Sequence, residues 1–144
     1  MNTLEEGKLQ FDFPDDWTVS AYDKWSYYQK HFKDAFAGNK GVDFVARDTS
    51  DNVWLIEVKD FRENRRTKEI PLWDEIAIKV RDTLAGLVGT SFYEGNPNQQ
   101  EAWNALESEK IRVVLHLEQP ETNSKLFPRA FDPQMVRQKL KHKN

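Results

Sequence analysis

The chain has 144 residues, of which 38% are hydrophobic and 12% aromatic, and this size suits one domain over residues 1–144 rather than two domains or a repeat array. Cysteine is absent, which excludes disulfides, cysteine nucleophiles and thiolate metal sites. The net charge of −3 argues against a general polyanion binder. No apolar run reaches the roughly 18 residues of a membrane span, and the acidic start does not resemble a signal peptide. We therefore expect a cytoplasmic protein without a membrane partner.

The first half of the chain predicts a strand, a helix and a hairpin. Residues 8–13 alternate apolar and polar side chains, which predicts a short strand. Aromatic side chains recur at helical spacing over residues 20–37 and predict a helix with Ser20 as its N-cap. Residues 41–47 and 53–59 predict two strands, and the turn residues between them favour an antiparallel hairpin.

The second half predicts helices around one further strand. A long helix is expected to begin at Pro71 or Asp74 and to end before Gly89. Three more elements follow: a short helix over 101–107, a strand over 111–117 and a basic helix over about 132–142. The resulting order predicts an α/β fold with three layers, α/β/α, around a central mixed sheet of four or five strands.

One group of charged residues stands out within this frame. Glu57 lies in an otherwise apolar strand, where a carboxylate is costly unless it is paired or binds a cation. Side chains alternate along a strand, so Glu57 and Lys59 project from the same face, and a tight hairpin brings Asp43 beside them. Clustered carboxylates are suitable ligands for Mg²⁺ or Mn²⁺. The alternative interpretation is a solvent-facing salt bridge between Glu57 and Lys59.

At Asp43, Glu57 and Lys59 the chain resembles the PD-(D/E)xK nuclease superfamily, with its restriction-endonuclease-like fold. The resemblance covers about residues 20–118. It implies a Mg²⁺-dependent endonuclease that hydrolyses phosphodiester bonds of DNA or structured nucleic acid. It further implies that Asp43, Glu57 and the main-chain carbonyl of Val58 hold the metal, and that Lys59 is the catalytic lysine. Small nucleases of this kind often form homodimers.

Many members of this superfamily carry a further acid on their first helix. Asp23 is the nearest candidate here, but its helical position turns it away from the aromatic stripe, and we expect it to face solvent. The Glu-x-Lys pattern alone is weak, because the chain also has it at Glu6-Gly7-Lys8, where no strand is predicted.

Basic residues follow the strand that carries Glu57. Such residues suit phosphate contacts, which provide affinity without reading sequence. The alternatives are a solvated surface and, for the lysine on the next helix, a side chain that extends to water. A catalytically degenerate module that binds nucleic acid or a protein partner is the second functional hypothesis, and a plain interaction protein is the third. The residues proposed for nucleic-acid contact are Arg62, Arg65, Arg66, Lys68 and Lys79.

Overall fold

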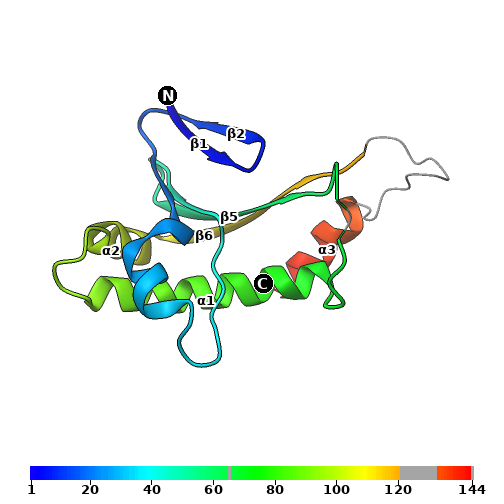
Figure 1. The fold of residues 1–144 in the computed structure, drawn as a ribbon. Coiled ribbons are helices and arrows are strands. Elements are labelled where there is room, and N and C mark those ends of the chain that lie inside the picture. The colour runs from blue at the N-terminus through cyan, green and yellow to red at the C-terminus, as the bar shows by residue number, and fades with distance from the viewer. Residues whose placement is uncertain (65, 121–132, 144) are drawn as a thin grey trace.

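A computed structural model describes residues 1–64, 66–120 and 133–143 of the chain. Its centre is a four-stranded mixed sheet, accompanied by a separate two-stranded hairpin and by helices (Figure 1). The predicted α/β class with a mixed sheet is therefore confirmed. The strands are β1 (Asn2–Glu6), β2 (Leu9–Phe13), β3 (Thr18–Ala21), β4 (Phe44–Arg47), β5 (Asn52–Asp60) and β6 (Lys110–Glu118). The helices are η1 (Tyr22–Lys24), η2 (Tyr28–Phe32), α1 (Leu72–Phe92), α2 (Gln99–Leu106) and α3 (Pro133–Lys143).

The predicted hairpin is present and forms the middle of the sheet, whose order is β3-β4-β5-β6. β4 pairs antiparallel with β5, with Phe44 opposite Ile56. The carboxylate of Asp48 stabilises the turn by accepting hydrogen bonds from the backbone N–H groups of Ser50 and Asn52. β6 pairs parallel with β5 along its length, so β5 is a central strand, as its apolar sequence predicts.

The helices α1, α2 and α3 pack against one face of the sheet (Figure 1). Ile76, Val80 and Leu87 of α1 are buried at helical spacing, as predicted, and they belong to the same core as Val53 and Leu55 of β5. Side chains alternate along a strand, so Glu57 and Lys59, which lie on the same face of β5 as Leu55, also face α1.

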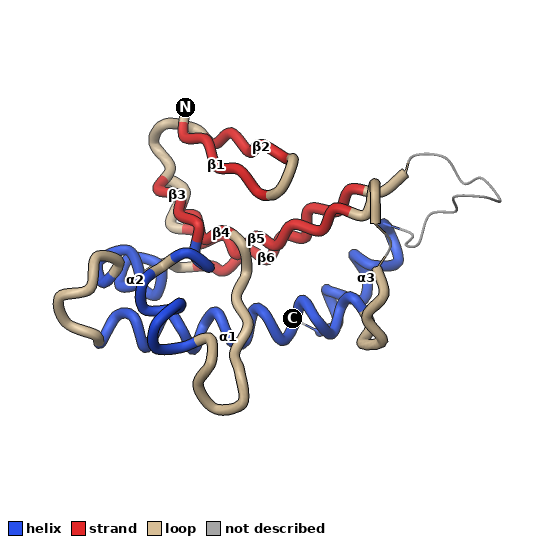
Figure 2. Tube along the Cα trace, viewed as in Figure 1, coloured by secondary structure: helices blue, strands red, loops and turns tan. Residues whose placement is uncertain are grey.

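The opposite face of the sheet is covered by the hairpin of β1 and β2 (Figure 2). Phe11 and Phe13 contact Phe44 edge to face and join a second core with Ile56 and Val58. The sequence predicts helices on both faces, but in the described part of the chain this second face carries strands. The prediction included β2 and missed β1, its partner.

The prediction of one continuous helix over residues 20–37 is wrong, because this range holds the end of β3 and the short helices η1 and η2. Ser20 and Ala21 instead end strand β3, where they pair with residues 45 and 44 of β4. Ser20 does not cap a helix, because its hydroxyl accepts a hydrogen bond from the indole of Trp25. Beyond η2, Phe36 has a φ of 50° and is almost fully exposed. Tyr22 and Trp25 are buried in the core beneath the sheet, with Tyr28 packed against them, so these aromatic residues do not form the buried face of one helix.

Helix α1 runs past Gly89, where the sequence predicts its end, and reaches Phe92. The glycines serve close packing. A Cβ on Gly86 would lie 1.9 Å from the hydroxyl of Tyr22, and one on Gly89 would lie 2.3 Å from that of Tyr27. Glycine at these positions therefore lets two tyrosines lie directly against the helix backbone.

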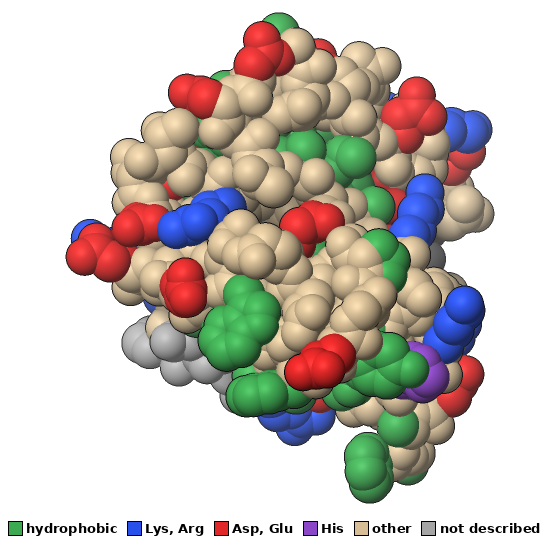
Figure 3. Space-filling model, turned by 90° about the vertical axis from the view of Figure 1, so that its left-hand side faces the viewer, with side chains coloured by type: hydrophobic (Ala, Val, Ile, Leu, Met, Phe, Trp, Pro, Cys, Tyr) green, Lys and Arg blue, Asp and Glu red, His purple; other side chains and the backbone are tan. Residues whose placement is uncertain are grey.

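Hydrophobic side chains also reach the surface at one end of the molecule (Figure 3). Phe92, Tyr93 and Trp103, around the end of α1 and on α2, are 71%, 46% and 39% exposed. Among the described helices, none combines the length and the apolar character that crossing a membrane requires.

Candidate active site

The site begins where β4 and β5 separate. Their pairing starts at Phe44, and the residues before it turn away from β5 toward helix α1. There the backbone N–H of Val42 donates to the hydroxyl of Thr83 at 3.0 Å, and the N–H of Lys40 donates to the carboxylate of Asp82 at 2.9 Å. This divergence leaves the end of β5 open on the side of β4.

Asp43 lies at this opening, and its side chain accepts a backbone hydrogen bond that a paired strand would otherwise accept. Its Oδ2 atom accepts a hydrogen bond of 2.7 Å from the backbone N–H of Val58. Its carboxyl group also lies within hydrogen-bonding reach of the carboxyl group of Glu57. Burial raises the pKa of Asp43, although the Val58 N–H and the contact with Glu57 oppose this. The structure thus brings the two predicted carboxylates together.

Glu57 is almost completely buried, with 2% of its side chain exposed. Its Oε2 atom pairs with the ammonium group of Lys79, and the Nζ atom of Lys59 lies 3.4 Å from the same oxygen. Its Oε1 atom is buried and receives no hydrogen bond from the described residues. Burial raises the pKa of Glu57 to about 7, the nearby Asp43 contributes to this, and Lys79 opposes it.

A second buried carboxylate, Glu75 of α1, lies on the other side of Lys59. It forms an ion pair with Lys59, and its Oε1 atom lies 3.0 Å from Arg66 and 2.7 Å from Lys68. Burial alone would raise the pKa of Glu75, but hydrogen bonds from Lys59 and Lys68 outweigh it and lower the pKa to about 2. Glu75 and Lys79 are four residues apart on one helix face, so both reach the strand that carries Glu57.

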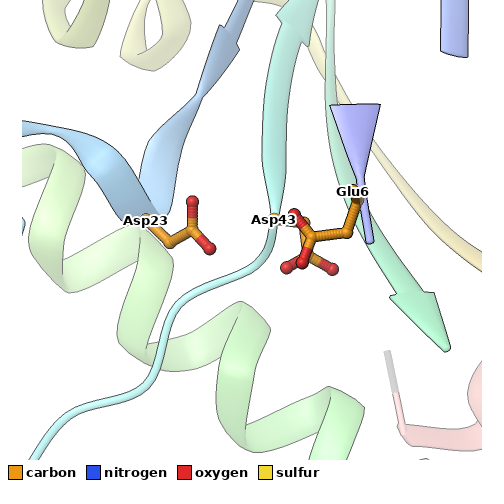
Figure 4. A group of neighbouring side chains, drawn as sticks. All are labelled: Glu6, Asp23 and Asp43. Atoms are coloured by element: carbon orange, nitrogen blue, oxygen red, sulfur yellow. The ribbon is translucent and has the colours of Figure 1, made fainter. Parts of the chain in front are cut away.

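Asp23 lies beside Asp43, contrary to the prediction that it faces solvent. Asp23 lies there because β3 ends at Ala21 and η1 follows at once. The N–H of Tyr22 donates to the carbonyl oxygen of Asp43, which holds η1 next to Asp43. Glu6, the last residue of β1, reaches the same place (Figure 4). One carboxylate oxygen from each of Glu6, Asp23 and Asp43 lies within 4.8 Å of the others.

Four of the five basic residues predicted to contact phosphate form ion pairs within the chain. Arg66 also donates to the carbonyl of Ile70 at 2.8 Å, and its side chain is buried. Arg62 pairs with Asp60 at 2.7 Å at the surface. Arg65 lies outside the described residues. Lys79 does not extend to water, since it is held against Glu57.

A cavity of about 220 Å³ opens beside Lys59, and Asp60, Asn64, Arg66 and Lys68 line it. It gives the end of β5 a path to solvent on its basic side. A larger cavity of about 510 Å³ lies between β6 and α3, with mainly aliphatic walls, and it does not include the charged residues of the site.

Two residues of this arrangement were not predicted. Glu75 carried a usable signal, because it stands four residues before Lys79, at a spacing that places both on one helix face. Glu6 belongs to the Glu-x-Lys pattern for which the sequence predicts no strand, and the structure shows it at the end of β1. Nothing local in the sequence indicates that Glu6 lies near Asp43, since 37 residues separate them.

Comparison with known proteins adds one relative. No family model matches the chain, and no solved structure matches it. The chain is 32% identical over 163 aligned residues to a cysteine–tRNA ligase of Neisseria meningitidis. The match includes 92% of this chain but 23% of the ligase, so the chain spans less than a quarter of the relative's length.

Proposed function

We propose that this protein is a metal-dependent nuclease with a restriction-endonuclease-like core over about residues 20–118. The observation that carries the proposal is the convergence of Asp43, Glu57 and Lys59 at the point where β4 and β5 separate. The order of β3, β4, β5, α1 and β6 in the chain supports the fold. The cavity beside Lys59 supports access for a substrate at the end of β5.

The residues present fit Mg²⁺ or Mn²⁺. Both ions prefer oxygen ligands, and the site offers carboxylates. Glu57 Oε1 supports this fit, because it is buried, no donor among the described residues satisfies it, and the carboxyl group of Asp43 lies beside the same side chain. A buried carboxylate oxygen without a donor is costly, and a cation would remove that cost. Asp43 and Glu57 would hold the ion, together with the carbonyl of Val58, and the ion would polarise a phosphodiester and lower the pKa of a bound water.

The protein groups around these ligands have separable tasks. The Val58 N–H fixes the orientation of the Asp43 carboxylate. Lys79 holds Glu57 through Oε2 and so fixes the orientation of a carboxylate that also meets the carboxyl group of Asp43. The ammonium group of Lys59 stands between Glu57 and Glu75, where it can stabilise negative charge that develops on an attacked phosphate.

Nucleic acid, and DNA in particular, is the proposed substrate class. Lys59, Arg66 and Lys68 line the cavity beside the site and would favour a phosphate backbone there. The relative is by name a ligase for cysteine and tRNA, which makes tRNA a structured nucleic acid worth testing next to DNA.

The test is cleavage by the purified protein in Mn²⁺ or Mg²⁺. Supercoiled plasmid, branched DNA, single-stranded DNA and tRNA serve as substrates, and EDTA serves as the blank. We expect cleavage that requires the metal, and a loss of at least 100-fold in rate for both Lys59→Ala and Asp43→Asn.

Lys110→Ala is the matched control, since Lys110 is exposed and lies at the opposite end of the β5–β6 pair from Lys59. It should cleave like the wild type. Circular dichroism should show that all variants remain folded. Absence of cleavage on every substrate, or cleavage that survives Lys59→Ala, would overturn the nuclease proposal.

A second candidate is a catalytically degenerate module that binds nucleic acid or a protein partner. The specific observation in its favour is that Lys79 occupies one oxygen of Glu57 while Glu75 engages Lys59. Under this hypothesis the protein binds nucleic acid equally well in EDTA and in Mn²⁺, and cleaves none. An electrophoretic shift assay in both buffers distinguishes the two candidates.

A further inference from the structure

Strand β6 forms one edge of the four-stranded sheet, and no other strand among the described residues pairs with its outer side. We propose that this side pairs antiparallel with β6 of a second copy of the chain, so that two sheets become one continuous sheet about a two-fold axis. The candidate active site lies within one chain, so this proposal stands independently of the nuclease proposal.

The outward-facing backbone groups of β6 belong to alternate residues. The N–H of Lys110 and the carbonyl oxygen of Glu118 both point to the side of β5, because they bond to the backbone of Asp51 and Phe61. Successive residues of a strand direct their N–H and C=O groups to opposite sides, so the pairing with β5 uses the even positions. The groups at positions 111, 113, 115 and 117 therefore point outward, and no backbone hydrogen bond from the described residues reaches them.

This edge is long and apolar, which is the kind of strand edge that proteins usually protect. β6 has nine residues, whereas β3, at the other edge of the sheet, has four. Ile111 of β6 is 51% exposed. The cavity of about 510 Å³ is lined by Val113 and also by Val114, whose side chains lie on opposite faces of the strand, so it opens along the edge. The edge thus combines open backbone groups with an aliphatic surface.

The sequence of β6 is complementary to itself when two copies run antiparallel. With the two-fold axis at Val114, Val113 of each copy lies opposite Leu115 of the other. Ile111 lies opposite Leu117 in the same way. These four positions are the ones whose backbone groups point outward, so each opposed pair would exchange two backbone hydrogen bonds.

The charges at the two ends of β6 favour this register. Lys110 of each copy lies opposite Glu118 of the other, and opposite charges at directly opposed positions stabilise a strand pair. No ion pair among the described residues includes Lys110. Glu118 pairs with His116 of its own chain through Oε1, at 2.9 Å, which leaves Oε2 for the second copy. Arg112, which would lie opposite His116, is directed over the ring of Trp54 in its own chain, 5.5 Å from the centroid.

Helix α3 provides a cover for the added strand. Val136 and Leu140 of α3 line the cavity together with Ile111 and Leu115 of β6. The partner strand would present the same aliphatic residues on this face, because the two-fold axis relates like faces of the two sheets. Their side chains would extend into the cavity and bury its apolar walls.

Sedimentation velocity of the intact chain over a series of protein concentrations tests the proposal. A single strand pair lies at the small end of specific interfaces, so we expect a dimer that dissociates on dilution. Lys110→Glu opposes like charges at both ends of the pair and should raise the dissociation constant about fivefold or more, and Glu118→Lys should do the same. The double variant exchanges the two charges and should dimerise like the wild type, because opposite charges face each other again.

Lys30→Glu is the matched control for charge. It makes the same change at an exposed residue of η2, outside β6, and should dimerise like the wild type. Circular dichroism should show that every variant is folded.

A proline tests the backbone pairing itself. Ile111→Pro removes an outward N–H from each copy and leaves the hydrogen bonds to β5 in place, as prolines on edge strands do. Ile111→Ala shortens the same side chain and keeps the N–H. We expect the proline variant to remain a monomer at concentrations at which the alanine variant dimerises.

The outcomes decide the proposal separately from the nuclease. A wild type that is monomeric at every concentration would overturn it and leave a strand of another protein as the occupant of this edge. A dimer that is as tight in Lys110→Glu or Ile111→Pro as in the wild type would overturn it, as would a double variant that does not recover. The expected pattern without cleavage of any substrate would support the strand pairing and overturn the nuclease.

Discussion

Glu57 and Glu75 are the same residue type at nearly the same depth, with 2% and 1% of their side chains exposed, and their chemistry differs. Burial raises the pKa of Glu57 to about 7, whereas the pKa of Glu75, which burial would also raise, falls to about 2 because basic groups outweigh it. Lys59 lies between the two and contacts both.

The difference comes from the neighbours. Glu75 is surrounded by Lys59, Arg66 and Lys68, and its charge is compensated several times over. Glu57 has Lys79 and, at 3.4 Å, Lys59 on its Oε2 atom, and the carboxyl group of Asp43 adds a like charge next to it. Depth alone therefore does not identify a functional carboxylate. Each of the two has one buried oxygen without a hydrogen bond from the described residues, so the contrast lies in the charges around them. A buried acid that three basic groups compensate stabilises the fold, and a buried acid beside a second carboxyl group is the one suited to bind an ion.

The largest expected effect is on stability, from the substitution Glu75→Gln. It removes the partner of three cations, two of which, Lys59 and Arg66, are mostly buried. Leaving buried charges uncompensated typically costs about 3–5 kcal/mol. Urea unfolding at pH 7 should show a decrease of this size in the free energy of unfolding.

Two matched variants show whether that loss is specific. Glu69→Gln removes the same charge from an exposed position nearby and should change stability by less than about 0.5 kcal/mol. Glu57→Gln at pH 5.5, where Glu57 is mainly protonated, should change it by less than about 1 kcal/mol. Equal losses for Glu57→Gln and Glu75→Gln would mean that the two carboxylates contribute to stability in the same way.

The next largest effect is on how the free energy of unfolding decreases at acid pH. Because the pKa of Glu75 is lowered from 4.5 to about 2, the unfolded chain binds more protons than the folded one between these values. Stability is therefore fully present above pH 4.5 and falls as the pH drops toward 2, by roughly 2–3 kcal/mol from this residue. Glu75→Gln should flatten that part of the curve in urea unfolding between pH 2.5 and 6. If Glu75→Gln lost stability at acid pH as steeply as the wild type, other titrating groups would be responsible for that loss.

Added Mn²⁺ should stabilise the folded protein through Glu57 rather than through Glu75. If Asp43 and Glu57 bind Mn²⁺ in the folded state alone, a free concentration ten times the dissociation constant stabilises the protein by about 1.4 kcal/mol. Thermal unfolding with and without Mn²⁺ measures this gain. Asp43→Asn should remove it, and Glu75→Gln should retain it. A gain that is the same in Asp43→Asn would place the ion elsewhere.

The sequence predicts the centre of the sheet and the meeting of Asp43, Glu57 and Lys59, because those depend on local patterns. Alternation and turn residues define the hairpin, and an acid within an apolar strand marks Glu57 as unusual. The helix over residues 20–37 fails because an aromatic repeat fits either a helix face or a tertiary core. Tyr22 packs against Gly86, more than 60 residues further along the chain, and this contact favours the tertiary core over the helix face.

The remaining ligand candidates depend on contacts between distant segments. Asp23 reaches the site because β3 ends where it does, and Glu6 reaches it because a hairpin packs across the outer face of the sheet. The pairing of Lys59 with Glu75 likewise needs the placement of α1 against β5. Residue spacing within the sequence contains no information on these contacts.

The smallest expected effect concerns the ion pair between Lys8 and Glu63, which is mostly exposed, with 72% and 66% of the two side chains accessible. Exposed pairs contribute about 0.2–1 kcal/mol because water screens them and the side chains lose freedom. Lys8→Ala should therefore lower stability by at most 1 kcal/mol, in contrast to Glu75→Gln. Phe11 and Phe13 still hold the hairpin against the sheet in this variant. A loss above about 1 kcal/mol in urea unfolding would mean that this surface pair, rather than the aromatic packing, holds the hairpin in place.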